Sequence, residues 1–131
     1  MTESGTHSRR DPAMRVTAMP ADANAYGDIF GGWLLSLMDS GAGLIAARRA
    51  KGRAVTVAMD AVEFHKPVKV GDEVSVYAEI TRVGRTSMEI CTDAYRRERH
   101  SDREERVTSA KFTFVAVDDH GHPRSVNEAQ S

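Results

Sequence analysis

The sequence predicts an α+β domain in which an antiparallel sheet curls around one long, buried helix. Apolar side chains cover almost the whole circumference of the segment 31–50, which is typical of a helix buried on most sides. After Gly52 the apolar period changes from helical to alternating, and the alternation returns in four long segments separated by short turns. Because such a sheet leaves part of the helix uncovered, we expect two copies of the chain to pair.

Composition is typical of a single soluble domain. The 131 residues are 40% hydrophobic and 28% charged, and the formal net charge of −1 indicates neither a nucleic-acid surface nor a strongly anionic membrane surface. A single cysteine, Cys91, excludes an internal disulfide and a cysteine-built metal site. No apolar run is long enough to cross a bilayer, and the polar first ten residues lack the apolar core of a secretory signal. We therefore expect a cytoplasmic protein.

The chain divides into three predicted parts. Residues 1–13 are small, charged and polar, which predicts a disordered tail, and residues 119–131 predict a flexible tail for the same reason. Between them, residues 14–118 form one continuous domain without repeats or linkers.

The first elements of that domain are a strand, a loop and the helix. Residues 14–19 predict a short strand that ends at Pro20, and residues 20–28 are rich in turn formers. The helix is expected over 31–50, with basic residues near its C-terminus and Gly52 as its stop.

Four strands follow the helix. The first covers residues 55–64, where the apolar parity switches near Asp60 and Ala61 and indicates a β-bulge. The others are expected around residues 74–80, 88–94 and 110–116, joined by turns at 68–72 and 83–85. The charged run 96–106 predicts a solvated hairpin tip.

The candidate site lies at the start of the helix. Asp28 is followed by Gly31 and Gly32, and a helix N-terminus offers unpaired N–H groups and the positive end of a dipole. A carboxylate beside such donors suits acyl transfer, because one group can activate water while the others hold the oxyanion. The same residues can equally form a turn and a helix cap, which is the commoner use of this pattern.

The stretch Met19-Pro20-Ala21-Asp22-Ala23-Asn24-Ala25-Tyr26-Gly27-Asp28-Ile29-Phe30-Gly31-Gly32-Trp33 resembles the signature of the hot-dog acyl-CoA thioesterases of the bacterial YciA type. The resemblance continues through Met38-Asp39, residues 52–58, Phe64-His65-Lys66-Pro67-Val68, Val70-Gly71-Asp72 and Gly84-Arg85-Thr86-Ser87. It implies hydrolysis of acyl-CoA to free acid and CoA, with no cofactor or metal. It also implies active sites at the interface of a double hot dog, with homodimers assembled into a hexamer as a trimer of dimers.

The resemblance assigns roles at the helix start. Asp28 falls on the family's catalytic carboxylate, as general base or as nucleophile through a mixed anhydride. The main role expected for Asn24 is to shape the loop, and a contact with substrate is its second expected role. The N–H of Gly32, next to Gly31, is expected to polarise the thioester carbonyl. Tyr26 departs from the small or polar residue that close relatives often carry there.

Asp39 is the second acid to weigh, because it lies inside the apolar helix. In other hot-dog branches a helix carboxylate does the chemistry, but a buried acid is more often simply paired with an arginine or a backbone donor at an interface.

The CoA moiety should meet basic and hydroxyl side chains. Its phosphates predict contacts with Arg53, Lys66 and Arg85, and its pantetheine arm predicts backbone contacts along Val55, Thr56 and Val57. Gly31, Thr86 and Ser87 complete the predicted CoA-binding residues. Each of the three basic residues can equally be a solvated turn residue.

Two alternatives remain on the same fold. One is a hot-dog dehydratase or hydratase acting on acyl thioesters, which pairs an acid with a histidine, although residues 20–39 contain no histidine. The other is a non-catalytic acyl-CoA binding protein, which has no need of Asp28. Thiol release separates the binding protein from the enzyme, and enoyl-CoA hydration separates the lyase from the hydrolase.

Overall fold

The structure, a computed structural model, describes residues 11–128. Most of the predicted tail over 1–13, and residues 129–131 of the predicted C-terminal tail, lie outside the described residues. The elements are β1 (Met14–Thr17), the short 3-10 helix η1 (Pro20–Asp22), α2 (Gly31–Ala50), β2 (Ala54–Phe64), β3 (Glu73–Val83), β4 (Ser87–Arg97) and β5 (Glu104–Ala116).

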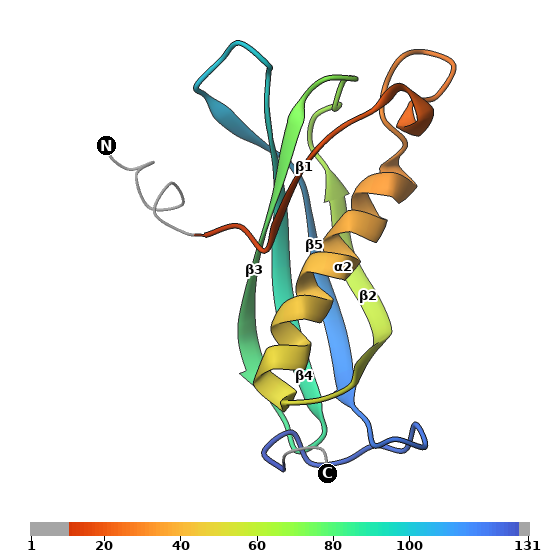
Figure 1. The fold of residues 1–131 in the computed structure, drawn as a ribbon, viewed down its shortest axis with the longest axis vertical. Coiled ribbons are helices and arrows are strands. Elements are labelled where there is room, and N and C mark those ends of the chain that lie inside the picture. The colour runs from red at the N-terminus through yellow and green to blue at the C-terminus, as the bar shows by residue number, and fades with distance from the viewer. Residues whose placement is uncertain (1–10, 129–131) are drawn as a thin grey trace.

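The five strands form one antiparallel sheet in the order β1-β3-β4-β5-β2, and α2 lies across one face of it (Figure 1). This confirms the predicted α+β class, the helix over 31–50 and the order of the elements along the chain, in which one strand precedes the helix and four follow it. Because β2 follows the helix but pairs with β5, it becomes an edge of the sheet.

The helix packs on the sheet through one stripe of residues: Leu34, Met38, Gly41, Ala42, Ala46 and Ala50. Gly41 is needed because a Cβ there would lie 2.9 Å from the Cγ1 of Val76 on β3. The opposite face of α2 remains open in the single chain, where Leu44 is exposed. The sheet therefore covers one face of the helix, and the part that was predicted to stay uncovered in one copy is the opposite face.

Strand β2 is irregular and exposed. Its pairing with β5 shifts between Asp60 and Glu63, where Ala61 has φ of 53°, and this confirms the predicted bulge. A second shift, between Thr56 and Ala58, was not predicted, and it turns Met59 to the helix side opposite Phe112. No residue of β2 is buried.

Both ends of the predicted charged hairpin tip belong to strands. β4 runs to Arg97 and β5 begins at Glu104, so only residues 98–103 form the tip. The prediction of a fully solvated run over 96–106 is wrong, because Arg96 pairs with Glu105 and Arg97 with Glu73.

The helix ends at Ala50, as predicted, but the left-handed residue that ends it lies one position before the predicted Gly52. Lys51 adopts the left-handed conformation, with φ of 52°, and the Gly52 N–H donates to the Ala47 carbonyl. Beyond β5, Arg124 donates to the carbonyl of Ala50, and Val126 is buried. The domain limits of 14–118 stay a prediction. These contacts show that the segment after β5 packs against the domain at least as far as Val126.

Candidate active site

One asparagine folds the loop ahead of α2. The Asn24 side-chain oxygen accepts hydrogen bonds from the backbone N–H groups of Tyr26 (2.8 Å) and Asp28 (3.1 Å). The Asn24 N–H in turn donates to the Asp28 carbonyl, at 2.7 Å. Gly27, with φ of 82°, makes the turn between them possible. These bonds set the position of Asp28 at the end of the loop.

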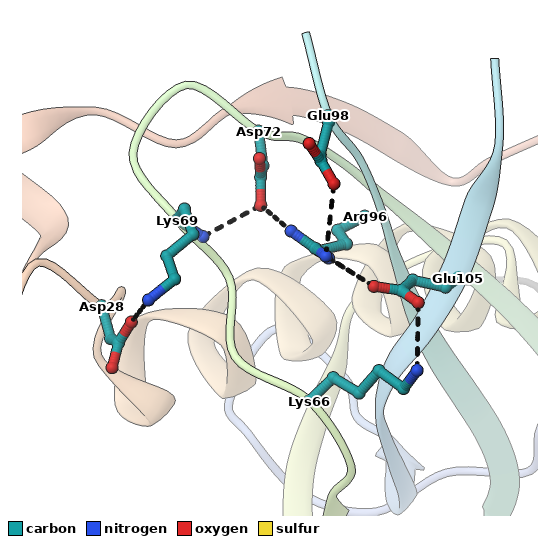
Figure 2. A network of polar contacts seen from close by, with 7 residues as sticks. All are labelled: Asp28, Lys66, Lys69, Asp72, Arg96, Glu98 and Glu105. Atoms are coloured by element: carbon teal, nitrogen blue, oxygen red, sulfur yellow. Dashed lines mark hydrogen bonds and ion pairs between the residues drawn. The ribbon is translucent and has the colours of Figure 1, made fainter. Parts of the chain in front are cut away.

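The Asp28 carboxylate forms an ion pair with Lys69 (Figure 2). The two residues also form a backbone β-bridge, so the pair joins the loop to the segment before β3. Asp28 does not cap α2, because the N-cap residue is Phe30 and no side chain bonds to the helix start. The interpretation of Asp28 as a helix cap is therefore wrong.

The start of α2 leaves two donors open. Across residues 11–128, the N–H groups of Gly31 and Gly32 meet no acceptor. They lie at the positive end of the helix dipole, where an oxyanion is favoured. A backbone of this kind can hold the developing charge on a thioester oxygen.

A pocket of about 370 Å³ opens beside this helix start. Its lining includes Asp28, Gly31, Leu34, Phe64 and Lys66. A Cβ on Gly31 would lie 3.0 Å from the Phe64 ring, so the glycine lets that ring pack against the first turn of α2. The pocket thus combines apolar walls with a carboxylate and an ammonium group.

The second acid has a different setting. Asp39 is half-buried on α2, and its Oδ1 accepts a hydrogen bond of 2.5 Å from the hydroxyl of Thr56 on β2. The partner predicted for Asp39 was an arginine or a backbone donor; the observed partner is this hydroxyl. Thr56 itself was predicted to contact pantetheine through its backbone. The pair lies at the exposed edge strand, where Val57 is 56% exposed.

The structure separates the predicted CoA contacts into two groups. Lys66 lies at the pocket, where its ammonium pairs with Glu105 at 3.1 Å. Arg53 follows the C-terminal end of α2 and donates to the carbonyls of Asp118 and Asp119. In the turn 85–87, the Val126 N–H of the C-terminal segment donates to the Arg85 carbonyl, and the Ala116 N–H at the end of β5 donates to the Thr86 carbonyl. The turn therefore lies at the opposite end of the sheet from the pocket (Figure 1).

Sequence reasoning missed three contacts of this region: that of Lys69 with Asp28, that of the Thr56 hydroxyl with Asp39, and that of Arg96 with Glu105. All three join separate segments of the chain, which residue spacing does not signal. Within the described part of the chain, no group of three or more His, Cys, Asp or Glu side chains is arranged to hold a metal ion. Nor does any helix described there have the length and apolarity needed to span a membrane.

Comparison with known proteins identifies relatives of this chain. The family model of the thioesterase superfamily matches residues 26–102. An uncharacterized acyl-CoA thioester hydrolase of Zymomonas mobilis, ZMO0511, is 53% identical over 88% of this chain and 78% of its own length. The acyl-CoA thioester hydrolase YciA of Escherichia coli is 43% identical over 94% of this chain and 97% of its own.

Solved structures agree with these relatives. HI0827, a hexameric broad-specificity acyl-coenzyme A thioesterase solved as an aspartate-to-alanine mutant, superposes with a TM-score of 0.87 at 41% identity, covering 92% of this chain and 88% of its own. An acyl-CoA hydrolase of Staphylococcus aureus, solved with butyryl coenzyme A and coenzyme A, gives a TM-score of 0.80 at 30% identity and covers 86% of this chain and 68% of its own. Alanine mutants of one asparagine, one aspartate and one threonine of that hydrolase were also solved.

Proposed function

This chain belongs to the thioesterase superfamily, among the YciA-type acyl-CoA thioester hydrolases, and from that membership we propose which of its residues carry out the hydrolysis. It is an acyl-CoA thioesterase that releases free acid and CoA, and its single chain has the hot-dog fold, one long helix on a five-strand antiparallel sheet. The match to YciA over nearly the full length of both chains is the observation that carries this function. The cytoplasmic location expected from the sequence stays a prediction.

We propose Asp39 as the carboxylate that activates water. The asparagine, aspartate and threonine replaced in the Staphylococcus aureus hydrolase are separated by 15 and 17 positions. Asn24, Asp39 and Thr56 have the same residue types at the same two separations. The hydrogen bond between Thr56 and Asp39 supports the assignment independently, because it joins two of these three residues directly.

The geometry of that bond suits a general base. The Thr56 hydroxyl occupies Oδ1 of Asp39, and Oδ2 accepts no hydrogen bond from any residue in the range 11–128. A carboxylate held through one oxygen can take a proton from water with the other. The water oxygen then attacks the thioester carbon. Collapse of the tetrahedral intermediate releases CoA, whose sulfur takes the proton back.

The oxyanion donors must then come from a second copy of the chain. Gly32 and Asp39 are seven residues apart on one straight helix, which separates them by roughly 10 Å along its axis at about 1.5 Å per residue. One thioester carbonyl cannot span that separation. A second copy at the exposed β2 edge would bring its own helix start towards Asp39.

Pairing through β2 would form the double hot dog. This edge exposes Val55, Val57, Met59 and Phe64, and exposed apolar edge strands are ready to pair with another chain. HI0827 is hexameric, and we propose a hexamer here as well. Val57→Lys should dissociate the assembly in sedimentation velocity, whereas an unchanged sedimentation coefficient would argue against pairing at this edge.

The role predicted for Asp28 is the competing proposal, and the two acids can be tested side by side. Thiol release from a panel of acyl-CoAs should fall by about 10² to 10⁴-fold in Asp39→Ala, because a general base contributes an effect of that size. Asp28→Ala should retain most of the turnover, because we assign its carboxylate to the ion pair with Lys69.

The opposite ranking would return the chemistry to Asp28. Thermal unfolding and sedimentation of both variants provide the controls, since the activity comparison requires both to keep the fold and the assembly. Absence of thiol release by the wild-type protein from every acyl-CoA would contradict the proposed function itself.

A further inference from the structure

Arg96 joins three segments that are far apart in the sequence. It lies near the end of β4, and its side chain is only 19% exposed although it carries a full charge. Figure 2 shows its guanidinium between Asp72, which ends the loop before β3, and Glu105 on β5. A planar guanidinium can span two carboxylates in this way because its five N–H donors point in fixed directions.

The first branch leads from Arg96 to the loop before β3. Arg96 donates to Oδ2 of Asp72 at 3.1 Å, and the same oxygen accepts the backbone N–H of Lys69 at 2.9 Å. Asp72 is buried, so this carboxylate depends on those two donors. Lys69 in turn holds Asp28, which lines the pocket at the helix start.

The second branch leads to the pocket directly. Arg96 donates to Oε1 of Glu105 at 2.7 Å, and Oε2 of Glu105 meets the ammonium of Lys66 at 3.1 Å. Hydrogen bonds from Arg96 and Lys66 hold the pKa of the Glu105 carboxyl below its usual range, so the carboxylate remains charged. Lys66 itself lines the pocket and is more than half exposed.

This arrangement leaves part of the Lys66 ammonium unengaged at the pocket. Glu105 divides its two carboxylate oxygens between Arg96 and Lys66, while Arg96 also contacts Asp72 and, at 3.7 Å, Glu98. Glu105 engages one of the three N–H donors of the Lys66 ammonium, and the other two remain for a ligand. Without Arg96, both oxygens of Glu105 would be left to engage Lys66 alone.

We propose that Arg96 is a positioning residue for CoA binding: it fixes Glu105 and Asp72, and so holds Lys66 at the pocket with its ammonium available to a phosphate of CoA. This inference rests on the proposed function, because it takes the substrate to be a CoA thioester. It assigns Arg96 no contact with the reacting atoms.

Arg97 is a matched control. It is the next residue of β4, and its guanidinium also pairs with one carboxylate, that of Glu73 on β3. Neither Arg97 nor Glu73 lines the pocket. Arg97→Met therefore removes a charge and an ion pair of the same strand without touching the Asp72 and Glu105 branches.

The test uses two thioesters with the same acyl group, one of CoA and one of N-acetylcysteamine, which has no phosphate. In Arg96→Met we expect the KM for the CoA thioester and the Kd for free CoA by titration calorimetry to rise about tenfold, the loss expected for one charge-assisted contact. The kcat and the rate with the N-acetylcysteamine thioester should stay within about twofold, and Arg97→Met should match the wild type in all of these.

An equal loss with both thioesters would overturn the proposal, because it would show a purely structural role. An unchanged KM and Kd would overturn it too. Should Arg96→Met fail to fold, Arg96→Lys decides: one ammonium cannot span Asp72 and Glu105, so its Kd for CoA must rise, and a wild-type Kd would overturn the proposal. The calorimetric Kd needs no turnover, which separates this result from any failure of the proposed hydrolysis.

Discussion

The two strands β4 and β2 have the same length but opposite surroundings. β4 lies in the middle of the sheet, and alternate residues from Met88 to Ala94 are buried under α2. β2 lies at the edge, and none of its eleven residues is buried. One chain therefore completes its core on one side of the helix and leaves apolar surface on the other. The Asp39–Thr56 pair lies on the incomplete side.

This difference connects stability and function to separate parts of the fold. We call the face of α2 packed on the sheet the closed side, and the opposite face with the β2 edge the open side. Burial of apolar side chains on the closed side offsets the entropic cost of folding, because these side chains leave water within a single chain. The open side can take part in binding and assembly, because its side chains still have surface to bury. Substitutions on the two sides should accordingly differ in what they change.

The largest difference is expected for a pair of facing residues. Phe112 on β5 and Met59 on β2 are register partners, but Phe112 is fully buried and Met59 is 42% exposed. Phe112→Ala should lower the free energy of unfolding by about 3–5 kcal/mol, whereas Met59→Ala should cost the isolated chain about 1 kcal/mol or less. Urea unfolding measures both.

Protein concentration sharpens this comparison. If a second copy covers β2, the cost of Met59→Ala should grow as the concentration rises and the assembly forms, while the cost of Phe112→Ala should change little. Equal costs for the two variants at low concentration would remove the distinction between the two sides.

Sequence patterns predicted the closed side better than the open one. The alternation in β4 and β5 and the apolar helix are local signals, and both were confirmed. The second bulge of β2 follows from pairing with β5, and the half-buried position of Arg96 follows from carboxylates on two other segments. Neither the bulge nor the position of Arg96 changes the hydrophobic periodicity of its own segment, so neither could be predicted from that periodicity.

The candidate site shows the same limit. The loop around Asn24 was predictable because its hydrogen bonds are made between residues at most four positions apart. The bond from Thr56 to Asp39 spans a helix and a strand, and it arises only once β2 lies beside α2. The sequence around an acid in a helix does not indicate which hydroxyl group of another segment will donate a hydrogen bond to it.

A smaller effect should distinguish two glycines of α2. A Cβ on Gly41 would lie 2.9 Å from Cγ1 of Val76, whereas a Cβ on Gly43 would lie 3.6 Å from the Phe114 ring, an ordinary contact. Gly41→Ala should therefore cost about 1–3 kcal/mol through overpacking. Gly43→Ala should stabilise the protein by about 0.5–1 kcal/mol, because alanine is the better helix former.

Thermal unfolding of these two single variants gives the signs directly. Stabilisation by Gly41→Ala would show that β3 can move away from the helix, and the closed side would then be less tightly packed than the structure indicates.

The smallest effect concerns the backbone of β2. Ala61 has φ of 53°, a conformation that costs a residue with a Cβ about 1–2 kcal/mol and glycine almost nothing. Ala61→Gly should stabilise the protein by up to about 1 kcal/mol, after the added flexibility of glycine in the unfolded chain is subtracted. Ala58, on the same strand but without positive φ, is the control, and Ala58→Gly should destabilise by about 0.5–1 kcal/mol. Opposite signs in urea unfolding would show that the bulge is held against a local backbone preference by the pairing of β2 with β5. Two destabilising substitutions would mean instead that the Ala61 methyl group makes contacts in the assembly worth more than the relief of its backbone.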